Sequence, residues 1–194
     1  MEGKIPVESI HKIVNLDGLK FSFSIQRTPA NCGPLSISNS LHFLEALNKV
    51  EIPEGFRSSS GIRKKMAEIR GDKSYESNNK WTDNFLLMEI MRKIPFLKYD
   101  ESNDKYFSDI TIFLIQNHFF SIVKNTNQNL ILLDSLRDPV VIGNAKNFLT
   151  VKAGDEFVKN KFGEVDSRTG YEFNKSAPKF KIGEQNPKIK IIKK

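Results

Sequence analysis

The chain has 194 residues and a net charge of +7, with 39% hydrophobic and 27% charged residues, which is the size and composition of one globular domain. Its single cysteine excludes an intramolecular disulfide, and three histidines beside one cysteine are too few soft ligands for a structural zinc site, so we expect no metal and no cofactor. With no run of 18 apolar residues and no signal-like N-terminus, we expect no membrane contact and a cytoplasmic protein, or one delivered by a secretion route that needs no such signal.

The N-terminal third predicts a hairpin followed by a helix. Residues 10–25 alternate between apolar and polar around the Asp-Gly pair at 17–18, which is typical of a β-hairpin with a two-residue turn. From Pro34 to about Asn48 the apolar residues recur at helical spacing instead. Cys32 therefore lies at the N-terminus of the predicted helix.

A polar, basic span follows over residues 51–80. It predicts a helix near residues 59–71, capped by Ser59 or Ser60 and ended by Gly71. Its cations either grip an acidic partner surface or phosphate groups, or they form an ordinary solvated helix face. The cations are Arg57, Arg63, Lys64, Lys65, Arg70 and Lys73.

The second half predicts a sheet. A helix over residues 84–94, capped by Thr82 or Asp83, stops before Pro95. Short runs rich in Ile, Phe, Val and Leu then predict strands near residues 96–100, 110–116, 118–125 and 129–136, and short helices near 144–149 and 155–162. Helices first and antiparallel strands after are typical of an α+β fold.

The chemistry is expected around Cys32. The helix N-terminus stabilises a thiolate, and the N–H group of Cys32 can donate to the oxyanion that forms when a thiolate attacks a carbonyl. Gln26, six positions upstream, is the candidate for a second oxyanion donor. The alternative is that Cys32 is a small, inert, buried residue.

Histidine is the expected base, because it exchanges protons near neutrality. His42 lies ten residues past Cys32 on the predicted helix, about 15 Å along its axis, and nothing orients His11. His118 begins a predicted strand, and the next strand returns so that position 118 faces roughly position 135. Asp134 is then close enough to hold the imidazole. The alternatives are a core histidine and an aspartate that only ends a strand.

Together, Gln26, Cys32-Gly33-Pro34, His118 and Asp134 resemble the papain-like cysteine peptidases, most closely the branch that removes bacteriocin leaders. The run CGPLSISNSL is also similar, more weakly, to the nucleophile helix of ubiquitin-trimming cysteine proteases. This resemblance implies a papain-like fold in which Cys32 is the nucleophile, His118 the base and then the acid, Asp134 the group that orients it, and Gln26 an oxyanion donor. The candidates for substrate contact are Asn31, Gly33, Asn117 and Trp81, the last as a platform or as a core residue.

Three functions remain open. The first is a protease that cuts a peptide or isopeptide bond, with a protein, a peptide or a ubiquitin-like tail as the substrate. The second is a deamidase or acyl-transfer effector, because water or an amine can resolve the same thioester. The third is an inactive binding module of the same fold.

The charge excess is concentrated at the C-terminal end. Residues 177–194 hold six lysines against one glutamate, without a zinc-finger spacing, an RNP-type motif or an arginine-rich run, so a nucleic-acid partner is not expected. We therefore expect a catalytic domain over residues 1–165 and a basic extension over residues 166–194.

Overall fold

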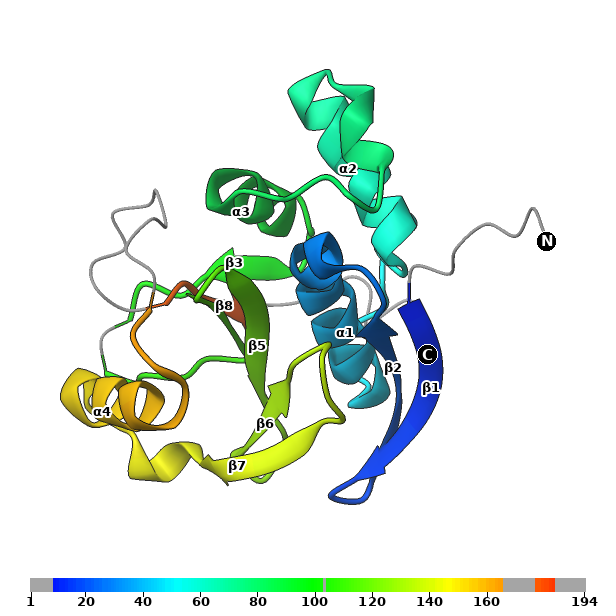
Figure 1. Ribbon diagram of the computed structural model, residues 1–194. Coiled ribbons are helices and arrows are strands. Elements are labelled where there is room, and N and C mark those ends of the chain that lie inside the picture. The colour runs from blue at the N-terminus through cyan, green and yellow to red at the C-terminus, as the bar shows by residue number, and fades with distance from the viewer. Residues whose placement is uncertain (1–8, 103, 166–176, 184–194) are drawn as a thin grey trace.

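The computed structural model describes residues 9–102, 104–165 and 177–183 (Figure 1). Its helices and strands form the mixed helix and sheet arrangement expected of an α+β chain. In order they are β1 (Ser9–Leu16), β2 (Leu19–Gln26), η1 (Pro29–Asn31), α1 (Cys32–Ala46), α2 (Ser59–Arg70), η2 (Lys73–Glu76), α3 (Asn84–Arg92), β3 (Leu97–Tyr99), β4 (Ile110–Ile115), β5 (His118–Lys124), β6 (Asn129–Leu133), β7 (Val140–Asn144), η3 (Ala145–Asn147), α4 (Val151–Phe162) and β8 (Lys179–Ile182).

A six-stranded antiparallel sheet forms the centre of the molecule, in the order β3-β8-β4-β5-β6-β7. Along its middle strands, successive side chains point to opposite faces, as the two-residue period of a strand requires, and both faces are buried. Ile112, Val123 and Ile131 belong to the core cluster that includes α1, whereas Phe113 and Phe120 belong to the cluster that includes α4. The sheet is therefore covered by α1 on one face and by α4 on the other (Figure 1).

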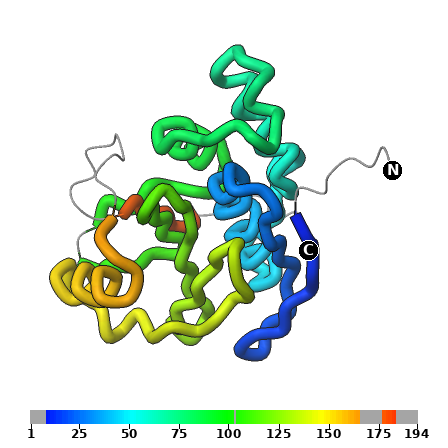
Figure 2. Tube along the Cα trace, in the orientation of Figure 1, coloured from blue at the N-terminus to red at the C-terminus, as the bar shows by residue number. Residues whose placement is uncertain are grey.

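Helix α1 is buried along nearly its whole length, between the sheet and the β1–β2 hairpin (Figure 2). Its serines satisfy polar contacts inside this packing. The Ser36 hydroxyl donates to the Gly33 carbonyl, and the Ser40 hydroxyl lies 2.7 Å from that of Ser121 on β5. A serine-rich helix can therefore be buried here without leaving these hydroxyls unpaired.

The β1–β2 hairpin has the predicted Asp17-Gly18 turn, and both residues have positive φ (53° and 79°), as a type I′ turn needs. Hydrogen-bonded pairs alternate along the ladder from Leu16–Leu19, so the backbone N–H and C=O groups of Ser24 point away from β1. The side chain of Asn39 on α1 takes both, accepting from Ser24 N–H (2.9 Å) and donating to Ser24 C=O (3.0 Å).

The caps of α2 and α3 follow the expected chemistry with one correction. Helix α2 ends at Gly71 in the left-handed conformation (φ 62°), but its cap is Ser58, whose hydroxyl accepts from Gly61 N–H, and not Ser59 or Ser60. Asp83 caps α3 by accepting from Leu86 N–H.

The predicted domain boundary at residue 165 is too early. Lys179–Ile182 from the expected basic extension form β8, which lies inside the sheet and pairs with β3 on one side and β4 on the other. The rest of that extension, residues 166–176 and 184–194, lies outside the described residues. In the described part of the chain, no helix is both long and apolar enough to cross a membrane.

Replacing Asn39 by Ala should lower the free energy of unfolding by about 2 kcal/mol, because two buried backbone groups of Ser24 lose their partner. Urea unfolding monitored by circular dichroism measures the change. The matched control is Asn15→Ala on the exposed strand β1, which should shift the midpoint little. Equal effects of the two variants would contradict this role for Asn39.

Candidate active site

Cys32 is the first residue of α1 and follows the short helix η1. Only 1% of its surface is exposed, and it is a free thiol. The N–H groups of the first turn of a helix lack intrahelical acceptors, so the sulfur lies at the positive end of the helix dipole.

His118 is the first residue of β5, directly after a two-residue turn in which Gln116 and Asn117 have positive φ (53° and 63°). This turn sets the register Ile115–His118 and brings the imidazole to the end of the sheet beside α1. Its Nε2 lies 2.7 Å from Asp134 Oδ1.

Asp134 reaches His118 because β6 ends one residue earlier, at Leu133. The β5–β6 register pairs Ser121 with Leu133, which extrapolates to residue 136 opposite His118, one position beyond the predicted 135. The chain turns before that point, and Asp134 Oδ1 also accepts from Leu136 N–H at 3.0 Å. Arg137 Nε lies 3.3 Å from the other carboxylate oxygen, Oδ2.

Cys32 lies beside the start of β5. Its sulfur accepts the N–H of Phe119 at 3.4 Å, and its thiol raises the pKa of His118 through a side-chain hydrogen bond. Because Nε2 of the ring is bonded to Asp134, Nδ1 is the nitrogen left for the sulfur. The imidazole is bonded to the carboxylate, and the sulfur is bonded to the residue that follows His118 and raises the pKa of the ring, so we treat the three groups as one row.

The environment of this row favours a charged imidazole. Burial lowers the pKa of His118, but the hydrogen bond to Asp134 and the contact with Cys32 outweigh it and raise the pKa to about 9. For Asp134, burial raises the pKa, but the bonds from His118 and Leu136 N–H lower it further, to below its ordinary value. At neutral pH the row therefore holds an imidazolium between an ionised carboxylate and the sulfur.

Gln26 ends β2 and is fixed to the chain after β6. Its N–H donates to the Ser135 carbonyl at 2.9 Å, and its Oε1 accepts from the Ser135 hydroxyl. Its Nε2 donates to the carbonyl of Thr28 at 3.1 Å and has a longer contact, 3.4 Å, with that of Pro29. The side-chain amide nitrogen of Gln26 is therefore bonded to the segment that leads to Cys32. Gln26 and His118 line the same pocket.

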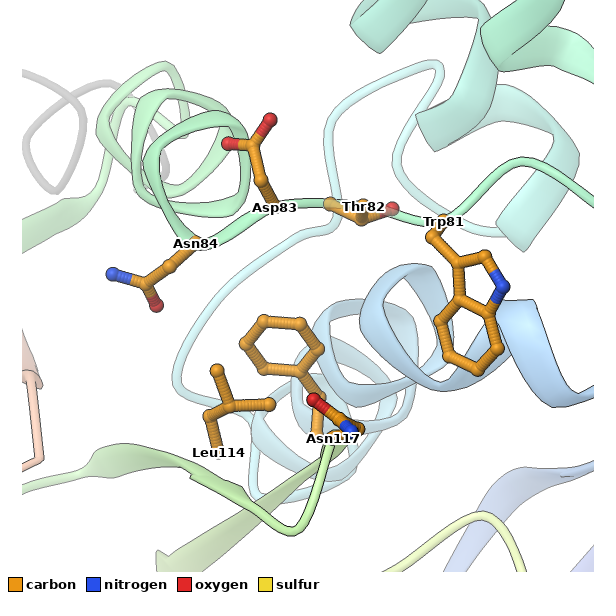
Figure 3. A pocket seen from close by; sticks show the side chains of 7 residues that line it. Trp81, Thr82, Asp83, Asn84, Leu114 and Asn117 are labelled. Atoms are coloured by element: carbon orange, nitrogen blue, oxygen red, sulfur yellow. The ribbon is translucent and has the colours of Figure 1, made fainter. Parts of the chain in front are cut away.

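Two pockets flank the row. One, of about 280 Å³, is lined by Gln26, Trp81, Asn117 and His118 among others, and the other, of about 450 Å³, is also lined by Trp81 and Asn117. Figure 3 shows the second pocket, with Leu114 and Asn117 facing the segment that begins at Trp81. The indole is 54% exposed and precedes α3, so it forms a cleft wall and not part of the core.

Asn31 and Gly33 do not face this cleft, contrary to the prediction. Asn31 is fully buried, and its side chain accepts from Arg63 Nε (3.0 Å) and donates to Ser59 Oγ (3.3 Å). Gly33 is buried against the Thr82 side chain, which an added Cβ would meet at 3.2 Å. Both residues therefore pack behind the segment that carries Cys32.

Four of the six cations in the basic span make contacts within the protein. Arg63 is fully buried, Arg57 pairs with Glu45 at 2.7 Å, and Arg70 pairs with Asp83 at 2.9 Å. Lys65 lies over the Phe56 ring. These four cations make contacts within the protein, which weakens the expectation of an acidic or phosphorylated partner at this span.

The other histidines lie apart from the row, as expected. His42 Nε2 contacts the Arg57 carbonyl (2.8 Å), and His11 Nδ1 contacts the Ser24 hydroxyl (2.6 Å). Across the described residues, no three His, Cys, Asp or Glu side chains are grouped as a metal ion would need.

The sequence analysis did not identify three groups at the site: the N–H of Phe119, Ser135 with its two hydrogen bonds to Gln26, and the buried Arg63. Ser135 follows Asp134 directly, so its place in the run DSL was the one available signal. A backbone N–H and a buried arginine leave no signal in a single sequence, because tertiary contacts define both.

Replacing Asp134 by Asn should lower the pKa of His118 well below 9, because burial is then opposed only by the Cys32 contact. NMR titration of the three histidine Cε1 protons measures this directly. Asp138→Asn, which removes the exposed partner of Lys12, should leave the titration unchanged. If Asp134→Asn also left His118 titrating near 9, the assignment of this pKa to the carboxylate would be wrong.

Comparison of the chain with protein-family models, with curated proteins and with solved structures found no match. Function is therefore inferred from the geometry of the described residues.

Proposed function

We propose that this protein is a thiol-dependent hydrolase that cleaves a peptide or isopeptide bond through an acyl-enzyme, with a papain-like arrangement of its nucleophile helix and sheet. The observation that carries the proposal is the row of Cys32, His118 and Asp134, which come from three separate segments of the chain. A nucleophile, a base within reach and a third group that orients the base are the elements of nucleophilic catalysis.

In the acylation step, the Cys32 thiolate attacks the carbonyl carbon and forms a carbon–sulfur bond, while the carbonyl electron pair moves to oxygen. When the tetrahedral intermediate collapses, the carbon–nitrogen bond breaks. The His118 imidazolium gives its proton to the leaving amine. The raised pKa of His118 suits this role, because the ring holds the proton until the amine needs it.

In the deacylation step, neutral His118 takes a proton from water as the water oxygen attacks the thioester carbon. The carbon–sulfur bond then breaks, the acid product leaves, and the thiolate and imidazolium are restored. Asp134 keeps the ring oriented through Nε2 in both steps, so Nδ1 exchanges every proton.

Oxyanion stabilisation is assigned to the N–H of Cys32 and to Nε2 of Gln26. The 3.1 Å bond to Thr28 uses one amide hydrogen of Gln26, and the longer contact with Pro29 is the one that a substrate oxygen would replace. The Ser135 tie fixes Oε1, so the amide plane is set before substrate binds.

The cleft supports an extended polypeptide substrate. Trp81 and Asn117 line both pockets, so an extended chain that occupies both would place side chains on either side of these residues. The same row also serves a deamidase or acyl-transfer enzyme, and mass spectrometry of the reacted substrate separates cleavage from a one-dalton gain or a new cross-link.

Alkylation of Cys32 tests whether the sulfur is activated. Iodoacetamide should react with the wild-type protein nearly as fast at pH 6 as at pH 8, because a neighbouring imidazolium and a helix N-terminus both activate a thiol as a nucleophile. In His118→Gln, the rate should rise about 100-fold over the same pH range, as for an ordinary thiol. Intact-mass spectrometry follows the single cysteine. A wild-type protein that resists alkylation at both values would favour an inert thiol and a binding module.

Hydrolysis tests the reaction itself. Cys32→Ala should lower the cleavage of casein or of a fluorogenic peptide library by about 10⁴-fold or more while thermal unfolding stays cooperative. His42→Gln, on the same helix but bonded to the Arg57 carbonyl, is the matched control and should keep its activity. Unchanged cleavage by Cys32→Ala would refute the proposal.

Ubiquitin with a C-terminal electrophile tests one substrate class. An adduct at Cys32 that Cys32→Ala and His118→Gln fail to form would assign a ubiquitin-like substrate. If wild-type protein that cleaves peptides forms no adduct, a ubiquitin-like substrate is excluded and the peptidase assignment remains.

A further inference from the structure

Arg63 is the largest fully buried side chain of the described residues, although it carries a guanidinium group. Its five N–H donors are matched by five neutral oxygen acceptors, as a buried guanidinium requires. Nε donates to Asn31 Oδ1 (3.0 Å), Nη2 to the carbonyls of Ala30 (3.0 Å) and Asn78 (3.4 Å), and Nη1 to those of Lys80 (2.9 Å) and Tyr75 (3.3 Å).

These acceptors belong to two segments that are far apart in the sequence. Ala30 and Asn31 directly precede Cys32, and we call residues 28–33 the nucleophile segment. The other three acceptors lie within residues 75–80, the stretch that leads to Trp81. Because Trp81 forms a wall of the cleft, we call residues 75–82 the wall segment. One planar side chain from α2 therefore bonds to the segment that carries the sulfur and to the segment that carries the exposed indole.

Two smaller contacts join the same segments without Arg63. Thr28 Oγ1 donates to the Asn78 carbonyl at 3.3 Å, and the Thr82 side chain packs against Gly33. They show that the nucleophile segment and the wall segment meet along their length. Arg63 is the contact with the most hydrogen bonds among them.

The shape of the guanidinium matters more than its charge. Its donors point in fixed directions within one plane, so they set the distance between the two segments that they bind. Lysine has the same charge but a single ammonium centre, which cannot reach all five oxygens. The separation of the segments should therefore depend on arginine at this position.

We propose that Arg63 is a positioning residue, which fixes the nucleophile segment relative to the wall segment and so places Cys32 opposite the Trp81 side of the cleft. This role rests on the proposed function, because the sulfur and the cleft are the parts it positions. Arg63 itself acts only through Asn31, Ala30 and the wall segment.

The chain supplies a single reporter for each segment, since it has one tryptophan, Trp81, and one cysteine, Cys32. In Arg63→Lys and Arg63→Met, acrylamide should quench Trp81 more strongly than in the wild type, and iodoacetamide alkylation of Cys32 at pH 6 should change its rate. Neither measurement needs a substrate. Arg57→Met removes one charge from the same basic span, outside both segments, and should change neither reading.

The kinetic measurement is kcat divided by the fraction of protein whose Cys32 reacts with iodoacetamide. Arg63→Lys should lower it about 10²-fold, because a displacement of about 1 Å at the reacting atoms has that effect. A purely structural role would lower the melting temperature and the fraction of reactive protein but would leave kcat per reactive site unchanged. If Arg63→Met does not fold, Arg63→Lys and Asn31→Ala, which removes one acceptor, provide the same readings.

The outcomes separate the two proposals. Normal Trp81 quenching, normal Cys32 alkylation and normal kcat per site in folded Arg63→Lys would overturn the positioning role and leave the hydrolase intact. Hydrolysis that survives Cys32→Ala would refute the proposed function, whereas altered quenching and alkylation in the Arg63 variants would still show that Arg63 couples the segments.

Discussion

The N-terminus of α1 contacts β5 beyond the point where β6 ends. There β5 has no neighbouring strand on that side, and the candidate site depends on this gap. The backbone N–H groups of alternate residues of β5, such as Ser121 and Val123, point toward β6. The N–H of Phe119 points to the same side, but β6 has already ended there. Cys32 Sγ accepts it instead. The same early end of β6 turns Asp134 toward His118, so one truncated strand makes room for the sulfur and supplies the carboxylate.

Hydrogen bonds between polar groups within the protein hold the segments of this junction together. Ser135, which would face Phe119 if the ladder continued, is tied twice to Gln26. Asp17 at the tip of the first hairpin accepts from Asn125 and Asn129 near the β5–β6 turn. Both ends of the β1–β2 hairpin are thus bonded to the sheet, and α1 is held between them. Contacts within the protein therefore hold the candidate site in this arrangement.

The features that sequence alone predicted are local or follow from strand register. The Asp17-Gly18 turn, the helix after Cys32 and the antiparallel return that brings Asp134 to His118 all need only neighbouring residues or one hairpin. The burial of Asn31 could not be predicted, because it depends on an arginine 32 positions away. The place of β8 was also missed, because a short basic strand gains its position only from partners far along the chain. Periodic sequence patterns predict helices, strands and turns, but they do not predict single contacts between residues far apart in the chain.

The position of β8 also has a consequence for biosynthesis. This strand fills the gap between β3 and β4, so the sheet stays divided until residue 182 has left the ribosome, after the segments that carry Cys32, His118 and Asp134 have been made. The sheet core can therefore be completed only after residue 182 has been synthesised. A nascent chain that has not yet reached this strand would hold Cys32, His118 and Asp134 and still have an open core.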